Sequence, residues 1–167
     1  MMRILLAFVI ALLPMPAVAA EPVQPKAAKP IISRAVPIRH ITPGIEVLLS
    51  DRLELLAGKR VALLTNQTGV DRKGVRNIDL LRAHPAINLV ALFSPEHGAR
   101  GVAQAGEKVA SGLDSKSGLP VHSLYGETKM PTAKMMQGID IVLVDLQDVG
   151  TRFYTYASTL LYMLRAA

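Results

Sequence analysis

The chain has 167 residues, of which 50% are hydrophobic and 19% are charged, and its formal net charge at pH 7 is +6. This length and composition fit about one domain folded around an apolar core, not a disordered chain. The sequence contains no cysteine, which excludes disulfides, thiolate metal sites and cysteine nucleophiles. The basic residues are not clustered on a binding face, so we expect no nucleic-acid partner.

The first 20 residues have the pattern of an export signal. A positive start at Arg3 precedes an apolar run over 4–13, and small residues at 17–20 offer a cleavage site. The run is shorter than the roughly 20 residues that span a bilayer; a retained membrane anchor is the alternative. We therefore expect an exported protein, periplasmic or extracellular. Residues 21–43 hold five prolines and no hydrophobic periodicity, which predicts an extended tether.

The remaining residues, 44–167, alternate predicted helices and strands. Dense apolar residues between Ile45 and Leu56 indicate a first helix that Gly58 ends. Short apolar runs then indicate buried strands at 60–65, 88–93 and 139–145, and a weaker one at 119–124. Helices are expected between them and after them, at 77–83, 131–137 and 158–167. This order predicts an α/β fold with a parallel sheet and flanking helices.

Polar loops follow three of these strands. Parallel strands place all their carboxyl ends at one edge of the sheet, where ligands bind. The loops at 65–71, 94–101 and 147–152 each contain glycine and polar residues, which taken singly is ordinary turn chemistry. Glu96, His97 and Arg152, however, have no turn-forming reason to gather there. The sequence therefore predicts a functional site at this edge.

Two carboxylates of this edge, Glu96 and Asp148, suit glycoside hydrolysis, in which one protonates the leaving oxygen and the other assists attack. Partial burial is expected to raise the pKa of Glu96 toward that of a usable acid; the alternative is a solvated loop residue. Arg152 lies four residues after Asp148 and is expected to keep it ionised, unless the two form a structural pair. Asp145 is expected to be a structural residue at a strand end.

The other polar side chains of the edge suit substrate binding. Asn66, Gln67 and Arg152 can bind hydroxyl, amide or carboxylate groups. His97 fits a base, a metal ligand, a sugar hydrogen-bond partner or a plain surface histidine. The four histidines are scattered along the chain, so no metal site is expected. The first loop matches neither glycine-rich nucleotide motif, so we expect no cofactor.

Five sequence blocks carry a resemblance to a known family. They are LTNQTGVD at 64–71, LFSPEHG at 92–98, AGEKV at 105–109, LPVHSLYG at 119–126 and DLQDVGTRFYTY at 145–156. In this order they resemble the bacterial domain of unknown function 1343 family. Its characterised members are NamZ-type exo-β-N-acetylmuramidases of peptidoglycan recycling.

The resemblance implies a Rossmann-like N-terminal domain that meets a smaller C-terminal domain, with the active cleft between them. It implies release of N-acetylmuramic acid from the non-reducing end of peptidoglycan fragments, with Glu96 as the leading catalytic acid. The residues implied to line the sugar pocket are Asn66, Gln67, His97, Asp148, Arg152 and Tyr154. Because family members continue past Ala167, the chain is expected to lack the C-terminal domain and to be inactive alone. A non-catalytic periplasmic module that binds muropeptides at the same edge is the alternative.

Overall fold

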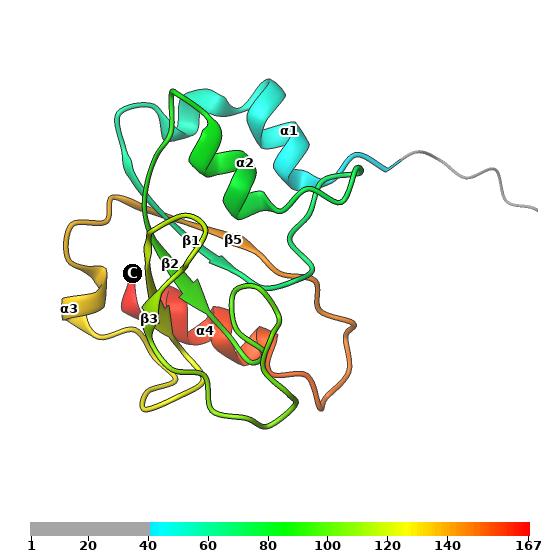
Figure 1. The fold of residues 1–167 in the computed structure, drawn as a ribbon, viewed down its shortest axis with the longest axis vertical. Helices are drawn as coiled ribbons and strands as arrows, with labels where there is room; N and C mark the ends of the chain where they lie inside the picture. Colours follow the sequence, from blue (N-terminus) through cyan, green and yellow to red (C-terminus); the bar gives the residue numbers. More distant parts are fainter. Residues whose placement is uncertain (1–40) are drawn as a thin grey trace, which may run out of the picture. The chain divides into compact units, whose positions relative to one another are not determined.

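The computed structural model describes residues 41–167 (Figure 1). The expected signal at 1–20 and most of the tether at 21–43 lie outside the described residues. The helices are α1 (Gly44–Asp51), the short 3-10 helix η1 (Leu53–Leu56), α2 (Asn77–Ala83), α3 (Ala133–Met136) and α4 (Tyr156–Ala166). The strands are β1 (Arg60–Thr65), β2 (Asn88–Ser94), β3 (Gly112–Leu113), β4 (Pro120–Ser123) and β5 (Ile141–Asp145).

The strands form one five-stranded sheet in the order β3-β4-β2-β1-β5. Four of them, β1, β2, β4 and β5, are parallel, as the alternation of strands and helices predicts. The two-residue β3, which the sequence does not predict, pairs antiparallel with β4 and makes the sheet mixed at this edge. Gly112 and Leu113 are both exposed, and such a short exposed strand leaves no hydrophobic pattern for the sequence to reveal.

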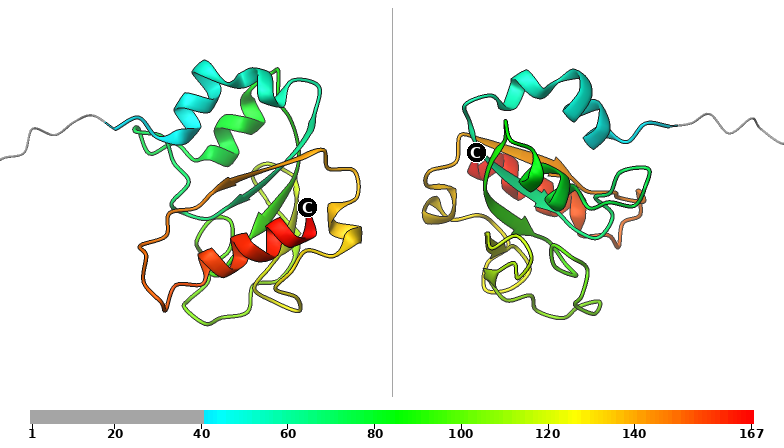
Figure 2. Two further views of the ribbon diagram at one scale, coloured as in Figure 1. Left: turned by 180° about the vertical axis from the view of Figure 1, so that it is seen from behind. Right: turned by 45° about the horizontal axis from the view of Figure 1, so that its top comes forward.

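Helices cover both faces of the sheet (Figure 2). Alternate residues of β1 point to opposite faces: Leu63 packs in one apolar cluster with α1, η1 and α2, whereas Leu64 packs in another with Met163 of α4. Both leucines are fully buried. The result is a three-layer α/β/α arrangement whose sheet holds the carboxyl ends of its strands in place.

The helix expected between Ile45 and Leu56 is two helices in the structure. Arg52 leaves the helical conformation, with φ −137° and ψ 20°, and separates α1 from η1. The break turns Leu56 into the core, where its side chain is fully buried. The strand β1 and the helix α2 coincide with their predicted ranges. Within residues 41–167, no helix is both long and apolar enough to cross a membrane.

Candidate functional site

The carboxyl ends of three neighbouring strands, β2, β1 and β5, lie level with one another. Leu64 pairs in register with Phe93 of β2 and with Val144 of β5, and Thr65 pairs with Asp145. The loops that follow β1, β2 and β5 therefore leave the sheet at one edge, as the sequence predicts.

A hollow of about 270 Å³ opens at this edge. Its walls come from the loop after β1, the loop after β2 and the segment that enters α4. We call it the Glu96 hollow; its lining residues are Gln67, Glu96, His97, Ala105, Phe153, Tyr154, Thr155 and Tyr156. Four of the residues that the sequence analysis singles out, Gln67, Glu96, His97 and Tyr154, thus meet in one cavity.

Both carboxylate oxygens of Glu96 accept hydrogen bonds. The backbone N–H of Gly106 donates to Oε1 over 2.8 Å, and the hydroxyl of Thr155 donates to Oε2 over 2.9 Å. Burial raises the pKa of Glu96, but these two donors, the nearby Tyr125 hydroxyl and His97 together outweigh it, and the pKa lies below its usual value. The expectation of a raised pKa is therefore wrong, because donors from distant segments stabilise the charged form.

His97 has an unusual backbone conformation beside Glu96. Its φ is +71°, and His97 is the only non-glycine residue with positive φ in the described part of the chain. The ring is fixed by Nδ1, which lies 2.9 Å from the carbonyl oxygen of Ala103. Because a carbonyl can only accept, Nδ1 donates the proton, and Nε2 is the nitrogen left for other partners. A strained residue held in this way is typical of functional sites.

Asn66 does not line the hollow, contrary to expectation. Its side chain is fully buried beneath the rim, and its Oδ1 accepts from both the backbone N–H and the hydroxyl of Thr68, over 2.9 and 2.7 Å. The Thr68 hydroxyl also accepts from the backbone N–H of Gln147 over 3.0 Å. Asn66 and Thr68 therefore tie the loop after β1 to the loop after β5.

Asp148 and Arg152 are exposed and lie outside the lining of the hollow. The Asp148 carboxylate accepts from the backbone N–H of Gly150 over 2.7 Å, which closes a local turn. Among the described residues, no ion pair joins Asp148 to Arg152. The structure therefore shows neither the ionising contact nor the structural pair that the sequence spacing suggests.

Asp145 has the structural role that the sequence favours. Its carboxylate accepts from the side-chain amide of Asn77 over 2.8 Å, and its carbonyl accepts from the Thr65 hydroxyl over 3.1 Å. These bonds join the end of β5 to β1 and α2, so the interpretation of Asp145 as a strand-end residue is confirmed.

Among the residues of the site that the sequence analysis misses, three are central: Gly106 and Thr155, which bond Glu96, and Tyr156, which lines the hollow. All three lie inside the blocks that carry the family resemblance, but nothing in the sequence shows which side chain of a block turns inward. The sequence analysis also misses Gly101, which lies close against Gln67. A Cβ at this position would lie 2.5 Å from the Cβ of Gln67.

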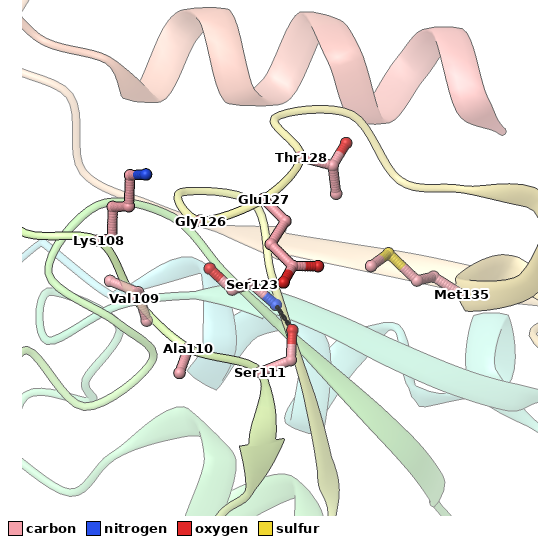
Figure 3. A pocket seen from close by; sticks show the side chains of 9 residues that line it. All are labelled: Lys108, Val109, Ala110, Ser111, Ser123, Gly126, Glu127, Thr128 and Met135. Carbon is pink, nitrogen blue, oxygen red and sulfur yellow. Dashed lines mark hydrogen bonds between the residues drawn. The ribbon is translucent and has the colours of Figure 1, made fainter.

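A second cavity, of about 420 Å³, lies beside β3 and β4 (Figure 3). Its lining includes Lys108, Ser111, Ser123, Glu127 and Met135, and the Ser111 hydroxyl accepts from the backbone N–H of Ser123 over 3.0 Å. It is larger than the Glu96 hollow but contains none of the predicted site residues. Within residues 41–167, no three acidic or histidine side chains come together as a metal site.

The sequence profile of one family, described as the N-terminal region of the exo-β-N-acetylmuramidase NamZ, matches residues 61–167. This match covers well over half of the chain. The chain belongs to this family. The resemblance stated from the five sequence blocks is therefore confirmed.

Relatives and solved structures agree with this assignment. The chain is 51% identical over 127 residues to the peptidoglycan β-N-acetylmuramidase NamZ of Bacillus subtilis (strain 168), a match that covers 76% of this chain and 31% of that protein. A crystal structure of a DUF1343 family protein from Bacteroides fragilis has a TM-score of 0.64 and 49% identity, over 71% of this chain and 29% of the other. A second DUF1343 family protein from the same species has a TM-score of 0.59 and 36% identity, and the match covers 75% of this chain and 31% of the other. The chain thus spans about 31% of the length of the B. subtilis relative.

Proposed function

We propose that the protein is a glycoside hydrolase that releases N-acetylmuramic acid from the non-reducing end of peptidoglycan fragments. The observation that carries the proposal is Glu96, a carboxylate with both oxygens hydrogen-bonded in a hollow at the carboxyl edge of the sheet. The names of the family and of the B. subtilis relative support the substrate class.

The contacts of Glu96 favour one role in the reaction. An N–H can only donate, so Gly106 holds Oε1 as an unprotonated oxygen. With its pKa lowered, Glu96 is ionised at neutral pH. In glycoside hydrolysis an ionised carboxylate activates water or attacks the sugar carbon, whereas the proton for the leaving oxygen comes from another group. We assign the ionised role to Glu96.

The neighbouring residues of the hollow have binding roles in this proposal. Gln67, His97 and Tyr154 present amide, imidazole and phenol groups to the same cavity, and such groups bind sugar hydroxyls and amides. Asn66, fully buried, supports the loop that carries Gln67. Asp148 and Arg152 lie on an exposed turn, so the proposal gives neither a part in bond cleavage.

Two further elements complete the proposal. The N-terminal pattern at 1–20 supports export to the periplasm or beyond, where peptidoglycan lies. Because the chain spans about 31% of its B. subtilis relative, we propose that residues 1–167 alone do not turn over substrate. Activity is therefore to be measured on the complete product of the gene.

The test is hydrolysis of a chromogenic N-acetylmuramic acid glycoside by the complete gene product. We expect release by the wild type and a loss of at least about a hundredfold in Glu96→Gln, the scale of acid–base contributions. Glu54→Gln is the matched control, because Glu54 is exposed on η1, away from the carboxyl edge. Saturable binding of the glycoside without turnover would favour the binding module instead.

A further inference from the structure

Tyr156 is the most buried ionisable side chain of the Glu96 hollow. Its side chain is 6% exposed, whereas that of Tyr154, which lines the same hollow, is 44% exposed. The two rings pack edge to face with centroids 5.6 Å apart. Tyr156 is also the first residue of α4, a helix anchored in the core by Met163. Its ring is therefore held in place at the back of the cavity.

Two side-chain amides influence the ionisation of Tyr156. The side-chain amides of Asn66 and Gln67 lower the pKa of the Tyr156 phenol, against the effect of burial. Asn66 is fully buried, and because its Oδ1 is occupied by the two donors of Thr68, its orientation is fixed. Its Nδ2 has no hydrogen-bond partner within the described region. An unpaired buried N–H is costly, so Nδ2 of Asn66 is a donor that remains available to an acceptor.

The proton of Tyr156 is retained at neutral pH. Burial raises the pKa of the phenol, the amides of Asn66 and Gln67 lower it, and the nearby Glu96 and Tyr154 raise it again; the pKa lies above its usual value. Tyr156 is therefore a protonated phenol that lines the same cavity as an ionised carboxylate. Glycoside cleavage requires this division between one protonated and one ionised group.

Two other donors of the hollow are engaged elsewhere. The hydroxyl of Thr155 donates to Glu96, and the Nδ1 proton of His97 donates to Ala103. Tyr154 stands more open to solvent. Tyr156 thus combines a retained proton and a fixed ring with amides that favour its charged form.

We infer that Tyr156 is a further catalytic residue, whose hydroxyl donates the proton to the glycosidic oxygen while Glu96 acts as the ionised partner. This inference rests on the proposed function. The bond between the sugar carbon and the glycosidic oxygen breaks, and that oxygen takes the proton of Tyr156. A water oxygen forms the new bond to the sugar carbon, and Glu96 accepts the water's proton. Transfer of that proton from Glu96 back to the phenolate, directly or through solvent, restores both groups.

The test compares two substrates with different leaving groups, using the complete gene product. Tyr156→Phe removes one oxygen and keeps the ring. On a disaccharide, whose leaving group is a poorly acidic sugar hydroxyl, we expect kcat to fall about a hundredfold. On an aryl glycoside with an acidic phenol as leaving group, we expect a loss of no more than a few-fold, since that departure needs no proton donor. The variant Glu96→Gln is expected to lose activity on both substrates.

Tyr162→Phe is the matched control, since Tyr162 lies on the same helix and lines a different cavity. We expect its kcat on both substrates to match the wild type. Equal losses of Tyr156→Phe on both substrates, or a change in KM alone, would overturn the proton-donor role. If the wild type cleaves neither substrate, it is the proposed function that fails.

A second variant keeps the inference testable should Tyr156→Phe not fold. Replacing Tyr156 with 3-fluorotyrosine keeps the ring and the hydroxyl and makes the phenol more acidic. We expect the disaccharide-to-aryl ratio of kcat to change, because proton donation limits only the disaccharide reaction. An unchanged ratio would contradict the inference.

Discussion

Thr155 offers a direct test of how the site sets the charge of Glu96. Thr155 stands at the N-terminus of α4 but makes no side-chain cap there; its hydroxyl donates to Glu96 over 2.9 Å instead. The variant Thr155→Val keeps the shape and removes this donor. Hydrogen bonds to charged groups contribute about 1.5–3 kcal/mol. Because Glu96 keeps the Gly106 donor, we expect the lower end of that range.

The effect on catalysis follows from this magnitude. Because this bond stabilises ionised Glu96 before the reaction, we expect its loss to lower kcat/KM chiefly at acidic pH, by up to roughly tenfold, the factor to which about 1.4 kcal/mol corresponds. Since the hydroxyl lowers the pKa of Glu96, its removal raises that pKa, and the ionised form is lost at a higher pH. The acidic limb of the pH profile of kcat/KM is therefore expected to move to higher pH.

The assay is the pH profile of kcat/KM of the complete gene product, which reports the pKa values of the free enzyme. Thr151→Val is the matched control, because Thr151 is exposed on the same segment and makes no side-chain hydrogen bond in the described structure. An acidic limb that stays in place, or that moves to lower pH, would refute the assignment of Thr155 as the donor that keeps Glu96 ionised.

Three further predictions concern the rim and the core. Asp148→Asn is expected to keep activity within about threefold, well below the losses of acid–base residues; a hundredfold loss in kcat without a fall in melting temperature would restore it as a catalytic carboxylate. Arg100→Met is expected to lower the free energy of unfolding by about 3 kcal/mol in urea titration, because it leaves the buried Asp114 without its charged partner; a loss below about 1 kcal/mol, typical of surface pairs, would contradict this. Gly101→Ala is expected to lower both melting temperature and kcat/KM, since φ is +73° and the added Cβ meets Gln67; unchanged values of both would show that the loop adapts freely.

The pattern of strands was readable from the sequence because buried parallel strands are continuous apolar runs. The run at 60–65 becomes β1 with the bounds expected, and its position between two parallel neighbours explains why five of its six residues are buried. The break at Arg52 and the exposed β3 were not predictable, since each depends on tertiary packing and leaves no periodic signal.

The candidate site was predictable as a place but not as a set of contacts. Glu96 and His97 were found because charged residues in a loop after a buried strand lie at the ligand-binding edge. The donors that decide the charge of Glu96 lie 10 and 59 residues away in sequence, at Gly106 and Thr155. No local pattern reveals such contacts, so burial alone suggested the wrong direction for the pKa. Asn66 shows the same limit: a polar loop residue can face inward as a support.

The most direct test of the Glu96 hollow as the sugar site is a crystal structure of the complete Glu96→Gln protein with an N-acetylmuramic acid disaccharide. We expect the terminal sugar in the hollow, with its glycosidic carbon facing the side chain at position 96 across the space for one water molecule. A disaccharide bound instead in the cavity lined by Lys108 and Met135 (Figure 3), with the Glu96 hollow empty, would contradict the account.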